Sequence, residues 1–147
     1  MVVTIFGTNQ ILKDKAVWWI STLPDFDQAT VEVIHKPVGF LDLIHNGSKA
    51  LFWSRVKTML KSAEESSDLT IFDFSLLDYL WYAEKRKISS PEFRKNILQN
   101  INSTHLIYLV DNTENHDSLV KFLHSLGVNF RDVTDEVINE ITRDSGL

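Results

Sequence analysis

The chain of 147 residues contains no cysteine, only three prolines and only five glycines. Without cysteine it can form no disulfide, thiolate zinc site, iron–sulfur centre or thiol nucleophile, and it suits a reducing compartment. No apolar run approaches the roughly 20 residues that span a bilayer, and no basic region precedes the apolar run at the N-terminus. We therefore expect a cytoplasmic protein with no membrane partner.

An excess of positive charge is also missing. The chain has 15 Lys and Arg against 20 Asp and Glu, a formal net charge of -5, and the two signs are mixed along the sequence. No stripe of Lys and Arg is present to neutralise phosphates, which argues against nucleic acid as a partner. The composition, 44% apolar and 24% charged, is that of a compact globular chain, and we expect one domain over residues 1–147.

Short apolar segments alternate with segments of helical periodicity. The expected strands cover residues 2–6, 30–35, 69–72, 105–110 and 128–133. Their hydrophobicity is mostly continuous, which is typical of parallel strands covered on both faces. The sequence thus predicts an α/β fold, a three-layer doubly wound sheet of about five parallel strands. We expect the first strand at its centre beside the third, with ligand sites at the carboxyl ends of the strands.

The loop after the first strand has part of the spacing of a phosphate-binding loop. Gly7 and Lys13 stand where the first Gly and the Lys of G-x4-G-K-[ST] belong, whereas Leu12 and Asp14 replace the second Gly and the hydroxyl residue. The second Gly lets backbone amides approach the phosphates, and the hydroxyl binds magnesium. The alternative is an ordinary turn with Lys13 in solvent, in which case Lys13→Ala changes fold and function little.

The third strand and the segment after it carry a family resemblance. Residues 70–83, which read TIFDFSLLDYLWYA, resemble the part of small P-loop nucleoside and nucleotide kinases where a strand ends in Asp-Arg and a second acid and an aromatic-Ala pair follow. The resemblance implies that Asp73 lies near the metal or the acceptor hydroxyl and that Asp78 lies on the first turn of the next helix. Phe74 stands where the family has Arg, a fixed bidentate donor to phosphate.

The resemblance continues in outline through the fourth strand and the last helix–strand pair. The family's lid, whose Arg residues close over the transferred phosphate, should follow the fourth strand, yet residues 111–118 contain neither Arg nor Lys, and Lys121 alone cannot replace an Arg pair. Phosphoryl transfer depends on cations around the transferred group, so these substitutions indicate a pseudo-kinase. The competing interpretation is an unrelated five-stranded α/β domain with the same layout.

Two other enzyme or signalling classes fit less well. A phospho-acceptor receiver domain would place its Asp where Asp73 closes the third strand. Such a domain also needs an acidic pair after the first strand and a Lys after the fifth, and residues 7–9 contain no acid while residues 132–135 contain no Lys. A hydrolase would need the Gly-x-Ser-x-Gly elbow, which is absent around Ser75.

No spacing among the five histidines is that of a metal site, so no metal is expected. His35 is the histidine to watch, because it leaves the second strand at the ligand edge. Lys36 beside it and Arg55 from a following helix are candidate contacts for an anionic ligand, although solvated cations are the more common case.

The chain has four Trp residues. Trp18 and Trp19 lie about 100° apart on the first helix, so one stripe cannot bury both, and we expect Trp18 to point to a flank where it contacts a second copy or a partner protein. The same reasoning extends, less strongly, to Trp53 and to Tyr82 beside Trp81. The competing interpretation is that these aromatics pack helices onto the sheet.

The sequence therefore favours a degenerate domain similar to nucleoside or nucleotide kinases that binds a protein, or a nucleotide without turnover, and needs no cofactor. The alternative is an active small phosphotransferase that uses magnesium and ATP. Its catalytic candidates are Asp73 and Lys13, its ligand-binding candidates are Gly7, Lys36, Arg55 and Asp78, and the interaction candidate is Trp18.

Overall fold

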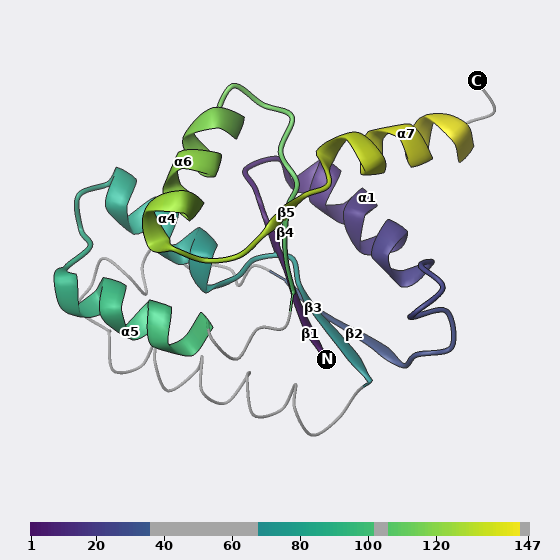
Figure 1. The fold of residues 1–147 in the computed structure, drawn as a ribbon, viewed down its shortest axis with the longest axis horizontal. Helices are drawn as coiled ribbons and strands as arrows, with labels where there is room; N and C mark the ends of the chain where they lie inside the picture. Colours follow the sequence, from purple (N-terminus) through teal and green to yellow (C-terminus); the bar gives the residue numbers. More distant parts are fainter. Residues whose placement is uncertain (36–67, 102–105, 145–147) are drawn as a thin grey trace.

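A computed structural model describes residues 1–35, 68–101 and 106–144, and it contains one parallel sheet of five strands (Figure 1). The order across the sheet is β2-β3-β1-β4-β5, so the first strand is central and lies beside the third, as predicted. The strand bounds are Val2–Phe6 for β1, Val31–Ile34 for β2, Leu69–Phe72 for β3, Leu106–Leu109 for β4 and Arg131–Asp132 for β5.

Helices cover both faces of this sheet, which gives the predicted three layers. Figure 1 shows one group of helices to the left of the strands and another to the right. The left group is α4 (Leu76–Lys85), α5 (Pro91–Ile101) and α6 (His116–Leu126), and the right group is α1 (Gln10–Ser21) and α7 (Thr134–Asp144).

The side chains of β1 explain why its sequence does not alternate. Phe6 packs into a cluster with α4, α5 and α6, whereas Val3 and Ile5 pack into a second cluster with α1 and α7. All five β1 residues are buried. A strand buried on both faces has no solvent side and therefore reads as a continuous apolar run.

Local capping signals set several helix ends. The Asn9 side chain accepts a hydrogen bond from the Leu12 amide, and Ser75 and Asp78 form a reciprocal capping box at the start of α4. Gly127 ends α6 in the left-handed region at φ 69°. Of the described elements, β5 departs most from the prediction, because the exposed edge segment pairs with β4 over only two residues.

The connections leave β1 and β3 in opposite directions. From β1 the chain passes through α1 to β2 on one side, and from β3 it passes through α4 and α5 to β4 on the other side. Ligands of open α/β sheets bind outside the carboxyl ends of adjacent strands at such a switch point. In this fold the switch point lies between β1 and β3. No helix in the described ranges is long and apolar enough to cross a membrane.

Candidate functional site

The turn between β1 and α1 is too short to cradle a phosphate. Only Gly7, Thr8 and Asn9 separate the strand from the helix, which begins at Gln10. The Lys13 amide donates to the Asn9 carbonyl at 3.0 Å, an ordinary helical bond. A phosphate loop needs free amides up to its Lys. The Gly7-to-Lys13 spacing is present, but the helix begins three residues before Lys13.

A close contact with β4 explains why residue 7 is Gly. A Cβ built on Gly7 would lie 2.0 Å from the carbonyl oxygen of Val110 and 3.0 Å from its carbonyl carbon. The Val110 amide in turn donates to the Phe6 carbonyl at 2.9 Å. Gly7 therefore permits the turn after β1 to lie against the end of β4, whatever else this turn does.

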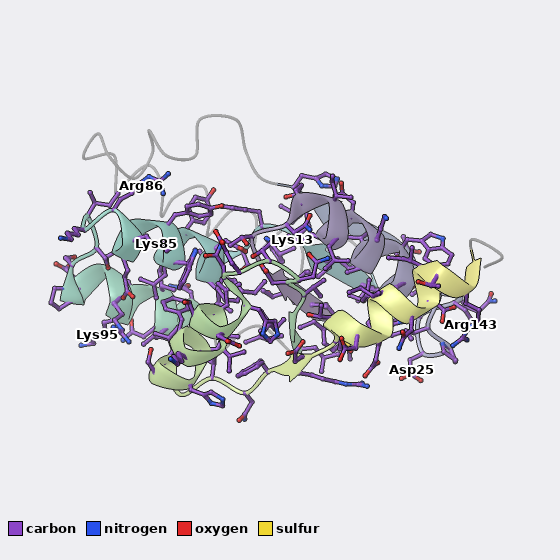
Figure 2. All side chains as sticks on the ribbon, turned by 90° about the horizontal axis from the view of Figure 1, so that it is seen from above. Lys13, Asp25, Lys85, Arg86, Lys95 and Arg143 are labelled. Atoms are coloured by element: carbon purple, nitrogen blue, oxygen red, sulfur yellow. The ribbon has the colours of Figure 1, made fainter. Side chains whose placement is uncertain are left out.

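Lys13 is buried, not in solvent. Its side chain is 2% exposed, and Nζ lies 2.8 Å from Oδ1 of Asp78, which is 1% exposed. Nζ also stands 5.3 Å from the ring centroid of Phe74. In Figure 2 the Lys13 label lies amid the side chains near the middle of the view, whereas the exposed Lys85 and Lys95 lie toward its left end.

This burial corrects the expectation that Lys13→Ala would change the fold little. Asp78 lies on the first turn of α4, as the resemblance implies, and its Oδ2 accepts hydrogen bonds from the Ser75 amide at 2.8 Å and the Ser75 hydroxyl at 3.1 Å. Burial raises the pKa of Asp78, while Lys13 and Ser75 act in the opposite direction. Removing Lys13 would leave this carboxyl buried without its cation.

Phe74, which stands where the resemblance would place an Arg, belongs to an aromatic group. Phe74 is buried, lies edge-on to Tyr79 with ring centroids 5.0 Å apart, and stacks with Tyr82 at 6.1 Å. The position thus fills apolar volume beside the Lys13–Asp78 pair. It offers no donor to a phosphate.

Asp73 lies at the switch point, directly after β3. The residue is fully buried, and its Oδ2 lies 2.6 Å from Nδ1 of His35 and 3.2 Å from Nε2 of Gln10. Its Oδ1 has no hydrogen-bond partner within the described residues. The His35 side chain is 68% exposed. The structure therefore brings the ends of β1, β2 and β3 together around one buried carboxylate.

Both carboxylate oxygens of Asp111, which follows β4, accept hydrogen bonds from the two residues Thr8 and Thr113. Oδ2 accepts from the Thr8 amide at 2.5 Å and hydroxyl at 2.6 Å, and Oδ1 accepts from the Thr113 amide at 2.8 Å and hydroxyl at 2.5 Å. Burial acts to raise the pKa of Asp111, but these donors outweigh it and lower the pKa. The sequence analysis does not predict this link between the two loops. The available signal was a Thr on each loop, Thr8 and Thr113, whose hydroxyls can donate to a carboxylate.

The segment after β4, where the resemblance would place a lid, is tied to the first loop. Asn112 Oδ1 accepts from Asn9 Nδ2 at 2.8 Å, and Asn115 Nδ2 donates to the Thr8 hydroxyl at 3.4 Å. The helix α6 begins at His116. The loop thus carries uncharged amide contacts where a lid would carry Arg.

The two adjacent Trp residues separate as predicted. Trp19 is 7% exposed and meets Tyr108 edge-on with ring centroids 6.1 Å apart, whereas Trp18 is 48% exposed. Trp18 lines a shallow depression of about 370 Å³ with Asp14, Lys15 and Ile141.

At the other aromatic pair, Trp81 belongs to the buried face of its helix, as its helical spacing predicts: it is 8% exposed and packs edge-on against Phe122 at 5.3 Å. Tyr82 beside it is half-buried. Three residues singled out in the sequence, Lys36, Trp53 and Arg55, lie outside the described residues.

The described part of the site thus combines a buried ion pair, a buried carboxylate at the switch point and two loops joined through Asp111. Comparison of the chain with protein-family models, curated proteins and solved structures gives no match.

Proposed function

We propose that this chain is a degenerate kinase-like domain that acts by binding another protein and does not transfer phosphoryl groups. The observation that carries the proposal is the engagement of Lys13 with Asp78 at 2.8 Å inside the protein. A phosphate-binding Lys must present its charge to the β and γ phosphates. Lys13 instead stabilises the packing of α1 against the start of α4.

The surroundings of Lys13 support the same conclusion. Phosphoryl transfer is catalysed mostly by positioned cations and amides around the transferred group. The Lys13 amide already donates to the Asn9 carbonyl in the first turn of α1, and the ring of Phe74 lies beside Nζ. A nucleotide retained by this domain would therefore be held without turnover. The alternative is an active phosphotransferase, which nucleotide binding through Lys13 would favour.

The exposed face of α1 is the proposed protein-binding surface. We call Ile11, Asp14, Lys15 and Trp18, with Ile141 of α7, the α1 face. Trp18 is 48% and Ile11 is 69% exposed, and large exposed aromatics are typical anchors of interfaces. Asp14 and Lys15 carry opposite charges beside Trp18, so a second copy related by a two-fold axis could pair each with the other. A second copy is therefore the favoured partner, and the cytoplasm is the proposed location.

Sedimentation equilibrium of the wild type and of Trp18→Ala tests this surface. We expect self-association in the wild type and at least a tenfold weaker association in Trp18→Ala, with an unchanged unfolding midpoint. Lys95→Ala, on the opposite layer, is the matched surface control. A wild type that stays monomeric and captures no partner through Trp18, or an association that Trp18→Ala leaves unchanged, would contradict the proposal.

A further inference from the structure

The carboxylate of Asp73 has one oxygen without a hydrogen-bond partner in the described residues, and the proposed function does not use this oxygen. It lies at the switch point between β1 and β3 and is fully buried, yet only Oδ2 has hydrogen-bond partners within the described residues. A buried polar atom without a partner costs free energy, so such an atom in a folded protein points to a missing donor. The missing donor can be water or part of a ligand.

The groups around Asp73 limit the chemistry of that donor. An ionised carboxylate only accepts hydrogen bonds, so His35 Nδ1 carries the hydrogen of the 2.6 Å contact with Oδ2. In the neutral tautomer that makes this bond, Nε2 of His35 is an acceptor. Gln10 Nε2 is shared between Asp73 Oδ2 at 3.2 Å and Asp14 Oδ1 at 3.0 Å. Lys13 is held by Asp78. With His35 in that neutral form, an incoming molecule meets acceptors and no available cation among these residues.

Such a site is the chemical opposite of a phosphate site. Phosphate is an anion that needs donors, whereas the atoms available here are Asp73 Oδ1 and His35 Nε2, with the carboxylate of Asp14 linked to the same Gln10. A hydroxyl group would supply one donor and no charge. An ammonium group supplies three donors and the positive charge that a buried carboxylate lacks.

We propose that Asp73 and His35 form a binding site for the protonated primary amine of a small organic molecule. Gln10 and His35 are exposed side chains that contact Oδ2 of the buried carboxylate. Exposed side chains change rotamer in picoseconds to nanoseconds, so their movement can open Oδ2 to an ammonium group without a change of fold. The site shares only Asp14 with the α1 face, and the proposal does not rest on the proposed function.

A titration followed by the NMR signals of the His35 imidazole tests the proposal with four simple probes. Butylammonium chloride is the ligand probe, 1-butanol is its neutral analogue, and sodium phosphate and magnesium chloride are the anionic and divalent arms. We expect a saturable shift with butylammonium only. Equal responses to butanol and butylammonium, or saturation by phosphate or by magnesium in place of the amine, would overturn the proposal, as would a merely linear response, which indicates that water fills the position.

Variants locate the binding. Asp73→Asn keeps the size of the side chain and removes its charge, and we expect it to weaken butylammonium binding at least tenfold. Asp117→Asn removes a carboxylate that is 96% exposed on α6 and should bind like the wild type. Gln10→Leu is a second site variant, which keeps Asp73 itself unchanged. It should alter the amine affinity because Gln10 donates a hydrogen bond to the carboxylate. Unchanged affinity in both site variants would refute the site.

Discussion

Replacing Lys13 with Met removes the cation beside a buried carboxyl while keeping most of the side-chain volume. Lys13 and Asp78 are 2% and 1% exposed, so solvent does little to screen the pair. Removing one partner of such a pair costs about 3–5 kcal/mol, because the remaining charge is buried without compensation. That is a large share of the roughly 5–15 kcal/mol by which small domains are stable.

The partner position offers an internal check on this magnitude. Asp78→Asn keeps an oxygen that can accept from the Ser75 amide, so it preserves part of the helix cap while removing the charge. The double variant Lys13→Met/Asp78→Asn has no unpaired buried charge, and it should recover most of the stability lost in Lys13→Met. Such a recovery is the non-additivity expected of residues in contact.

Urea unfolding followed by Trp fluorescence measures these differences. Lys13→Met should lower the unfolding midpoint at an unchanged denaturant slope, whereas Lys15→Met, on the exposed side of the same helix, should stay within about 0.5 kcal/mol of the wild type. A Lys13→Met protein within about 1 kcal/mol of the wild type would refute the buried pair and return Lys13 to the solvent or to a ligand.

Two further perturbations test other parts of the structure. Gly7→Ala should destabilise by about 3 kcal/mol in the same urea assay, because its Cβ would meet the Val110 carbonyl oxygen at 2.0 Å; Gly127→Ala, where only the φ of 69° is unfavourable, should cost about 1 kcal/mol, and equal costs would contradict the contact. His116 is the pH-sensitive group: burial acts to lower its pKa, but the carboxylates of Asp132 and Asp117 prevail and raise it. A raised folded-state pKa means that its contribution is fully present below about pH 6.5, the unfolded value, and is lost as the pH rises through the folded value. As the pH rises from 5.5 to 8.5, the midpoint temperature of thermal unfolding should therefore fall more steeply in the wild type than in His116→Gln. Parallel plots of midpoint against pH would show that the ion pair with Asp132 contributes no such stability.

The parts of the fold that the sequence predicts well are those with local signals. The strand Leu69–Phe72 is bounded by polar residues on both sides and was predicted with its observed ends. Ser90 and Pro91 mark the start of α5, where the Ser90 hydroxyl accepts from the Phe93 amide at 3.1 Å. The 100° step along a helix was enough to separate Trp18 from Trp19.

The site was harder to predict because its contacts join distant segments. Lys13 and Asp78 are 65 residues apart, and nothing near either residue indicates that they meet. The requirement for Gly at position 7 comes from Val110, the residue directly after β4. The spacing of Gly7 and Lys13 suggested a loop, whereas Asn9 caps α1 early and makes Lys13 a helix residue. The spacing of a motif gives only the distance along the sequence, whereas the capping by Asn9 determines that residues 10–13 are helical.

Isothermal titration calorimetry with magnesium-ATP tests most directly the claim that Lys13 serves the packing of the domain and not a phosphate. The account predicts no saturable heat of binding in the micromolar range for the wild type, and the same absence for the Lys13→Met/Asp78→Asn protein, whose fold is checked by circular dichroism. Micromolar binding in the wild type that disappears in the folded double variant would contradict the account and identify Lys13 as a phosphate ligand.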